Sequence, residues 1–308
     1  QMVRPMTYSR PPDEDEEVGK GFRDVTEGFV ISLARGDDLI TDPDEPIQED
    51  DELIMMQGYI ADNFGSLAGI GNSAKWLDVN LSIHTPYYMD LGSDTGLADE
   101  CAQSIQNAAL ILDALHGDIV VTSLGLYGKG RDREEVDNRI YDYIDYLTEW
   151  WKDRGLKTRF GVEITGQQEV FGSLEQVLDL CDNFPSVTPV VNFSHHHSRT
   201  DGSLLEVDDF KDILEQVAPY SGGRIHTAFA GVEYAGGDEK RLTPIKKGDL
   251  KFDPLADALI EMKPNATIIS TSPLLEHDAM YMRIIHERVL TKRVAKSLKD
   301  KKKSESSE

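Results

Sequence analysis

Residues 189–199 read Pro-Val-Val-Asn-Phe-Ser-His-His-His-Ser-Arg, a short apolar run that ends in a cluster of polar side chains. An apolar run of this length is typical of a strand that is buried on both faces of a parallel sheet. In parallel α/β folds the functional side chains gather directly after the carboxyl ends of such strands. The segment therefore predicts a buried strand and one side of a functional site.

On both sides of this segment, β-rich runs alternate with amphipathic helical patterns. Strands are predicted at Val79–His84, Ile119–Ser123, Thr158–Ile164, Pro189–Phe193, Ile225–Phe229 and Thr267–Ser270. Helices are predicted at Asp99–His116, Arg133–Asp153, Ser173–Asn183, Val207–Val217, Pro254–Met262 and Asp278–Ser297. This alternation predicts an α/β fold with a parallel sheet. Two weaker segments, near Val3–Tyr8 and Val25–Ser32, would complete the eight strands of a TIM (β/α)8 barrel; a doubly wound sheet is the structural alternative.

The length of 308 residues suits one such barrel, which typically takes about 250 residues. We predict a divergent N-terminal segment over residues 1–18, which includes the candidate first strand, and a barrel domain over 19–298. We expect the barrel to be irregular at its first strand and helix. Disorder is predicted for the acidic stretch Pro11–Glu17 and for the Lys-, Ser- and Glu-rich tail at 299–308.

The formal net charge of −24 counts against a nucleic-acid-binding surface, because neutralising phosphates requires Lys and Arg. Acidic residues spread along the whole chain are also typical of proteins adapted to concentrated salt, so the composition favours a haloarchaeal source. The basic stretch at 288–303 is read as a solvated terminal helix or as a contact arm for nucleic acid or a protein partner.

Cys101 and Cys181 lie in apolar helical patterns and are predicted to be buried free thiols, which suits a reducing cytoplasm. No run approaches the roughly 18 apolar residues of a membrane span, so no membrane partner is expected.

Histidines concentrate at the predicted strand ends. Five of the eight lie at or just after them, and Glu163 ends another strand; the histidines are His84, His195, His196, His197 and His226. Imidazole and carboxylate groups are ligands for zinc or manganese. If a barrel brings these strand ends together, the pattern predicts a metal site.

Five segments resemble, in order, motifs of the endonuclease IV family (AP endonuclease family 2), within the xylose isomerase-like TIM barrel superfamily. They are Leu81–Tyr88, Gly161–Gly166, Asn192–Gly202, His226–Tyr234 and Ile268–Ala279, the fourth being similar to an archaeal variant. The resemblance implies a TIM barrel and cleavage of DNA at abasic sites by a cluster of three zinc ions.

Of the nine ligand positions that the resemblance implies, four match: His84, Glu163, His195 and His226. The other five are occupied by Ser123, Asn192, Lys240, Leu242 and Thr271. We therefore expect a degenerate site with no three-zinc cluster and at most one Zn²⁺ or Mn²⁺. The expected metal ligands are His84, Glu163, His226 and His195, with His196 or His197 as supplements, and the first three are the expected catalytic residues. Asn192 and Thr271 also replace two of the four metal ligands of related sugar isomerases.

The resemblance places five side chains where they would contact substrate: Tyr87, Tyr127, His197, Arg199 and Lys240. His197 and Arg199 are alternatively read as groups that only orient their neighbours. Three functions stay open. They are an endonuclease IV-like protein with weakened, altered or lost phosphodiester hydrolysis, a single-metal sugar isomerase- or epimerase-like enzyme, and a non-catalytic barrel that binds DNA or protein.

Overall fold

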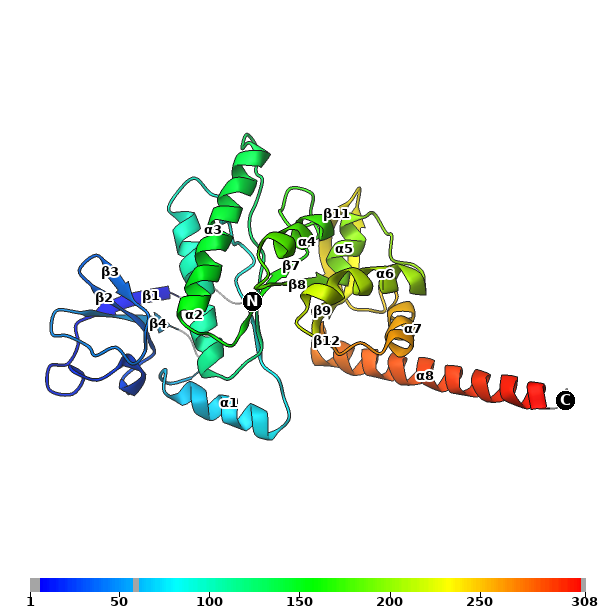
Figure 1. The fold of residues 1–308 in the computed structure, drawn as a ribbon, viewed down its shortest axis with the longest axis horizontal. Helices are drawn as coiled ribbons and strands as arrows, with labels where there is room; N and C mark the ends of the chain where they lie inside the picture. The colour runs from blue at the N-terminus through cyan, green and yellow to red at the C-terminus, as the bar shows by residue number, and fades with distance from the viewer. Residues whose placement is uncertain (1–5, 58–60, 306–308) are drawn as a thin grey trace. The chain divides into compact units, whose positions relative to one another are not determined.

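A computed structural model describes residues 6–57 and 61–305. The chain divides into two compact units (Figure 1). Unit 1 comprises residues 1–122 and 138–161, and unit 2 comprises 123–137 and 162–308. Six parallel strands are hydrogen-bonded in the order β12-β9-β8-β7-β6-β5. Of these, β5, β6 and the first half of β7 belong to unit 1, and the remainder belong to unit 2.

The six strands predicted from Val79 to Ser270 are confirmed with small changes of bounds. The strands are β5 (Ser82–His84), β6 (Ile119–Thr122), β7 (Arg159–Glu163), β8 (Val187–Asn192), β9 (Ile225–Phe229) and β12 (Ala266–Ser270). The crossover helices are α2 (Leu97–Ala114), α3 (Arg133–Asp153), α4 (Leu174–Asn183), α6 (Val207–Val217) and α7 (Phe252–Met262). The chain continues into α8 (Glu276–Glu305), so Lys299–Glu305 is helical where the sequence predicted disorder.

The two N-terminal strands do not join the parallel sheet. Unit 1 begins with a four-stranded antiparallel sheet in the order β1-β4-β2-β3. Its strands are β1 (Met6–Arg10), β4 (Glu52–Gln57), β2 (Val30–Arg35) and β3 (Asp38–Ile40). The prediction that Val25–Ser32 and Val3–Tyr8 complete an eight-stranded barrel is therefore wrong for the described residues; Val3–Pro5 lie outside them.

A tight turn explains this difference. Arg35 pairs with Asp38, so only Gly36 and Asp37 connect β2 to β3, and Gly36 has a φ of 60°. A two-residue connection produces antiparallel pairing, whereas parallel strands need a crossover of a dozen or more residues.

The antiparallel sheet has its own apolar core, which continues onto α1 (Ser66–Trp76) and α2. Phe22, of the short 3-10 helix η1 (Phe22–Asp24), packs edge-on against Phe64 at a centroid distance of 5.3 Å. The Pro11–Glu17 stretch forms turns around the Glu17 carboxylate, which accepts hydrogen bonds from Arg10 and from the Asp13 amide. Arg10 lowers the pKa of Glu17, and the prediction of disorder there is wrong.

In unit 2 the helices pack on the parallel strands through a row of aromatic rings. Phe193 contacts Phe210 of α6 and Phe229 of β9, and Phe229 packs edge-on against Phe252 of α7 at 5.0 Å. Two further elements were not predicted. They are the short helix α5 (Phe193–Arg199) and the antiparallel hairpin of β10 (Gly231–Ala235) and β11 (Asp238–Thr243). Both lie directly after parallel strands, where the functional residues were expected.

Candidate functional site

Strand register places two site residues of unit 2, Asn192 and His226, on one face of the parallel sheet. Val190 of β8 pairs with His226 of β9, and His226 pairs with Thr267 of β12. Side chains two residues apart on a strand point to the same face, so Asn192 at the end of β8 shares the face of His226. Asn192 and His226 are both buried.

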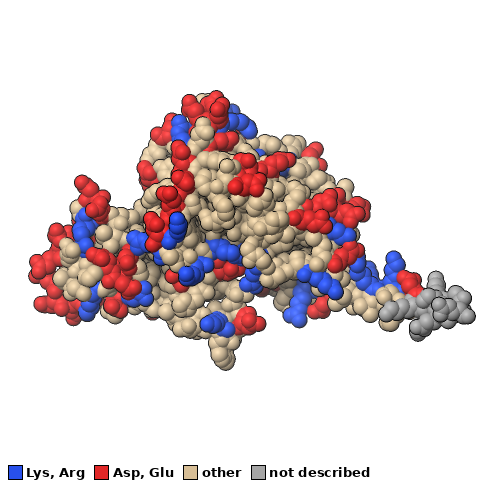
Figure 2. All heavy atoms as spheres, viewed as in Figure 1, with Lys and Arg blue, Asp and Glu red and all other residues tan. Residues whose placement is uncertain are grey.

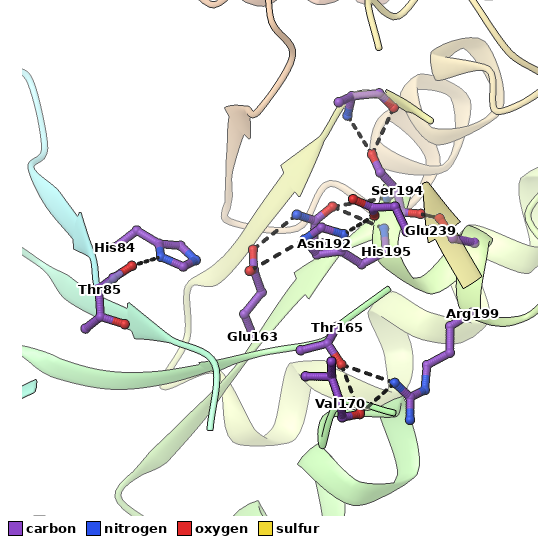
Figure 3. Close-up of polar contacts among 12 residues, drawn as sticks. His84, Thr85, Glu163, Thr165, Val170, Asn192, Ser194, His195, Arg199 and Glu239 are labelled. Atoms are coloured by element: carbon purple, nitrogen blue, oxygen red, sulfur yellow. Dashed lines mark hydrogen bonds and ion pairs between the residues drawn. The ribbon is translucent and has the colours of Figure 1, made fainter. Parts of the chain in front are cut away.

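Asn192 connects the start of α5 to Glu163 (Figure 3). Its Oδ1 accepts hydrogen bonds from the backbone amides of Ser194 and His195 and so caps the helix. These two bonds fix the orientation of the amide, and its Nδ2 donates to Glu163 Oε1 at 3.1 Å. The residue that replaces an expected aspartate ligand therefore acts as a hydrogen-bond donor toward the carboxylate.

His195 lies between two carboxylates. Its Nδ1 donates to Glu239 Oε2 at 2.5 Å, and its Nε2 lies 3.7 Å from Glu163 Oε2. Glu163 and His195 are almost fully buried, while the Glu239 side chain is 15% exposed. An imidazole in this position can pass a proton from one carboxylate to the other through its two ring nitrogens.

The β10–β11 hairpin supplies Glu239, and the loop after β7 holds the hairpin in place. The Glu239 amide donates to the Gly166 carbonyl at 2.8 Å, and the Gln168 amide donates to Asp238 Oδ1 at 2.9 Å. A Cβ atom on Gly166 would lie 2.6 Å from Glu239 Oε2 and 3.1 Å from His195 Nδ1. Only glycine fits here without moving the His195–Glu239 pair.

Helix α5, which carries His195, is tied to the end of β9 by a buried hydroxyl. Ser194 Oγ donates to the Ala230 carbonyl at 2.9 Å and accepts from the Ala230 amide at 2.8 Å. This two-way bond and the Asn192 cap fix the start of α5 and therefore the direction of the His195 side chain.

The Arg199 side chain forms hydrogen bonds within unit 2. Its guanidinium donates to Thr165 Oγ1 at 3.1 Å, to the Val170 carbonyl at 3.0 Å and to the Gln167 carbonyl. Burial is the main cause that lowers its pKa. The side chain therefore braces the loop after β7, as the orienting interpretation expected, and its contact with substrate stays a prediction.

His197 and Tyr127 also have partners within unit 2. His197 is fully buried; its Nδ1 accepts from the Leu204 amide and its Nε2 lies 3.3 Å from Asp249. The Tyr127 hydroxyl donates to Asp137 Oδ1 at 2.8 Å, and burial raises its pKa to about 12. Their predicted roles in substrate binding are not tested by these contacts.

Lys240 is exposed on β11, at the point where the register of the hairpin shifts between the Glu233–Arg241 and Tyr234–Glu239 pairs. In unit 1, His84 Nδ1 donates to the Thr85 carbonyl at 2.7 Å, and its ring stacks on Tyr87 at 5.3 Å. This bond leaves the lone pair of a neutral His84 on Nε2.

Among the described residues around Glu163, neither Asn192 nor His195 offers lone pairs to a metal ion. Asn192 turns its NH₂ toward Glu163, and the His195 Nδ1 proton is donated to Glu239, so acceptor lone pairs do not converge. Within residues 6–57 and 61–305, no group of three or more His, Cys, Asp and Glu is arranged to hold a metal.

Glu239 is the site residue that the sequence did not identify. The resemblance placed Lys240 at the corresponding ligand position, but the structure brings the preceding residue onto His195. A sequence signal existed: Gly236-Gly237 is a dipeptide typical of the turn of a two-residue hairpin.

A relative and several solved structures are similar to this chain. An uncharacterized protein of Methanocaldococcus jannaschii is 28% identical over 210 residues, which is 67% of this chain and 76% of that protein. A D-tagatose 3-epimerase-like protein superposes with a TM-score of 0.61 at 16% identity, covering 76% of this chain and 85% of that structure. Endonuclease IV from Thermus thermophilus superposes with a TM-score of 0.55 at 17% identity, covering 74% of this chain and 81% of that structure.

At these identities the structural similarities show the fold only. The model of one protein family, however, matches residues 54–281, which is most of the chain and includes every residue of the site described above. The parallel strands, the crossover helices and this match together confirm the predicted fold class: the chain belongs to the xylose isomerase-like TIM barrel family.

Proposed function

We propose that this protein is a metal-independent acid–base enzyme that acts on a small polyhydroxylated, sugar-like molecule. The observation that carries the proposal is the Glu163–His195–Glu239 arrangement, in which Asn192 donates to Glu163. A buried carboxylate with an imidazole relay to a part-exposed carboxylate is suited to taking a proton from carbon and returning it.

In the proposed step, Glu163 Oε2 accepts the proton from a carbon next to a carbonyl group, and the electron pair of the C–H bond moves into an enolate. The proton passes to His195 Nε2 as the Nδ1 proton moves to Glu239, which exchanges it with water. Return of a proton to the same carbon restores the carbonyl and inverts or retains the configuration. The separation of 3.7 Å on the Glu163 side would have to shorten when substrate binds.

A polyhydroxylated substrate is favoured by hydroxyl groups near the same end of the sheet. Ser270 Oγ and Thr271 Oγ1 are buried and have no hydrogen-bond partner among the described residues. Buried hydroxyls normally have partners, so substrate hydroxyls are suitable ligands for them. Hydrolysis of a phosphodiester would need charge neutralisation that metal ions usually supply, and Asn192 and His195 do not offer lone pairs to a metal ion.

The test is deuterium exchange at carbon, followed by NMR in D₂O with a panel of ketoses, aldoses and their phosphates. We expect exchange next to the carbonyl group that EDTA does not reduce. Glu163→Gln should lower the rate at least about 100-fold, the usual size of a general-base contribution. Arg241→Ala is the matched control, because Arg241 lies on the same hairpin and its guanidinium forms an ion pair with the exposed Glu233. Exchange that EDTA abolishes and Mn²⁺ restores would contradict the proposal.

An endonuclease IV-like role in binding abasic DNA is a second candidate, and one observation favours it. Tyr87 and Tyr88 follow β5 and are 63% and 86% exposed, and exposed aromatic rings are suited to stacking on unpaired bases. The net charge of −24 opposes it. Fluorescence anisotropy with an abasic duplex, measured from low to high salt, should show binding that Tyr88→Ala weakens; equal affinity for intact and abasic duplexes would reject this candidate.

A further inference from the structure

Helix α8 has 30 residues and two different apolar faces. One face packs onto the rest of unit 2 through Met282, Ile285 and Val289, each at most 9% exposed. Arg288 and Arg293 fasten the same helix to acidic residues of α7. The second apolar face lies on the opposite side of the helix, because the residues concerned are offset by about half a turn.

The second face is an exposed stripe with a heptad spacing. Met280, Ile284, Val294 and Leu298 are between 51% and 65% exposed. Glu287 and Thr291 lie between the first two and the last two of these residues. From Met280 to Leu298, the six residues follow one another at intervals of 4, 3, 4, 3 and 4. This is the spacing of the contact positions in a coiled coil, and scattered surface residues do not repeat in this way.

Charge is divided between the two ends of α8. Residues 288–305 contain eight Lys and Arg and two acids, whereas residues 276–287 contain three acids and one Arg. Figure 2 shows Lys and Arg on the part of α8 that is not drawn in grey. A second acidic chain is therefore repelled less by this part of α8 than by an acidic surface.

We propose that α8 pairs, in antiparallel orientation, with α8 of a second copy of this chain. The stripe is self-complementary in that orientation: Met280 opposes Leu298, Ile284 opposes Val294, and Glu287 opposes Thr291. The same register sets Lys296 and Lys299 of each helix at the level of Met282 and Ala279 of the other, so the lysines of the two helices stay apart. A parallel pair would bring the two lysine-rich ends together, and like charges side by side are unfavourable.

The central polar pair defines the register. Only the antiparallel alignment described above places Glu287 opposite Thr291 twice, with apolar pairs on both sides. A polar residue at a contact position selects one register and lowers stability. The apolar stripe spans about 27 Å, at 1.5 Å per residue, so the interface is short and the dimer reversible.

Sedimentation equilibrium of the full chain, at about 1 M salt where the Debye length is about 3 Å, tests the proposal. We expect a monomer–dimer equilibrium that Ile284→Lys weakens at least about tenfold and Glu287→Leu strengthens at least about tenfold, a change of about 1.4 kcal/mol each. Leu205→Ser is the control, because Leu205 is similarly exposed on the same unit but lies outside α8. A monomer at every concentration, or equal dimerisation of wild type and Ile284→Lys, would overturn the proposal.

Cysteine cross-linking tests the orientation, and the background is low because Cys101 and Cys181 are buried. The antiparallel register predicts that Ile284→Cys/Val294→Cys forms a covalent dimer on oxidation, whereas Ile284→Cys alone does not. Cross-linking of the single variant would show a parallel pair and contradict the assignment.

Binding to vesicles that contain phosphatidylserine is the last experiment, since a basic amphipathic helix can also bind anionic lipid. A chain that stays monomeric and binds these vesicles through α8 would likewise overturn the proposal.

Discussion

Asn192 donates a hydrogen bond to Glu163 across 3.1 Å, at the position where the resemblance to endonuclease IV expected two carboxylates to share a metal. An amide beside a carboxylate is a satisfied pair, whereas two buried carboxylates at this distance need a proton or a cation between them. We therefore expect Asn192 to stabilise the site in the absence of metal.

Asn192→Asp should therefore destabilise the protein by about 1–3 kcal/mol in the presence of EDTA, because it buries two carboxylates side by side and loses the donor to Glu163. Added Zn²⁺ or Mn²⁺ should recover part of the loss. The measurement is urea denaturation with and without metal. Asn183→Asp is the matched control, since Asn183 is exposed at the end of α4. A variant as stable as wild type in EDTA would show that the hydrogen bond is not important.

Gly166→Ala should reduce the proposed proton exchange at least about tenfold, because the new Cβ would displace Glu239 from His195. Gly69→Ala provides the control: nothing lies within 4 Å of its Cβ position, and in a helix the change should be neutral or slightly stabilising. Full activity of Gly166→Ala would show that the His195–Glu239 pair is not needed for the reaction.

Removal of metal should change little. We expect purified protein to contain well under one equivalent of zinc or manganese per chain by elemental analysis, and its melting temperature to be the same before and after dialysis against EDTA. About three equivalents of zinc per chain would contradict the account of Asn192 and Glu163.

His196 should make the protein sensitive to acid. Burial is the main cause that lowers its pKa from 6.5 to about 4, and its buried Nδ1 has no hydrogen-bond partner in the described part of the chain. Between pH 6.5 and about 4 the unfolded chain binds the proton and the folded chain does not, so stability is lost as pH falls through this window. The loss is at most about 3 kcal/mol.

Replacing His196 with Gln removes this titration, so the difference in unfolding free energy between variant and wild type should depend on pH between 4 and 6.5 and be constant above it. Urea denaturation at several pH values measures it. A difference that stays constant throughout would show that His196 titrates normally in the folded protein.

The sequence predicted the parallel strands well because each is a short apolar run with nothing in it that favours another structure. Ile225–Phe229 was predicted with its observed bounds, and Arg133–Asp153 likewise among the helices. The N-terminal strands were assigned to the wrong sheet because apolar content predicts a strand and not its partner. Gly36-Asp37, a two-residue turn signal, was the available indication of a hairpin.

The site was predicted only where it rests on strand ends. Glu163, Asn192 and His195 follow from the end of a strand or the first turn after it, and the sequence located them. Glu239 comes from a hairpin after β9 whose register shifts beside Lys240, and the Gly236-Gly237 turn signal does not reveal this shift. Assigning the role to Lys240 was an error of one residue, which put a basic side chain in place of a carboxylate.

The β10–β11 hairpin is a segment of the site that can vary without changing the parallel sheet. Its two strands pair only with each other, and its turn is Gly236-Gly237, so its length and sequence can change while the parallel sheet stays the same. Glu239 of the relay therefore lies on a segment that can vary independently of the strand that carries Glu163. Exchange of this hairpin between relatives is a direct route to altered reactivity on an unchanged barrel.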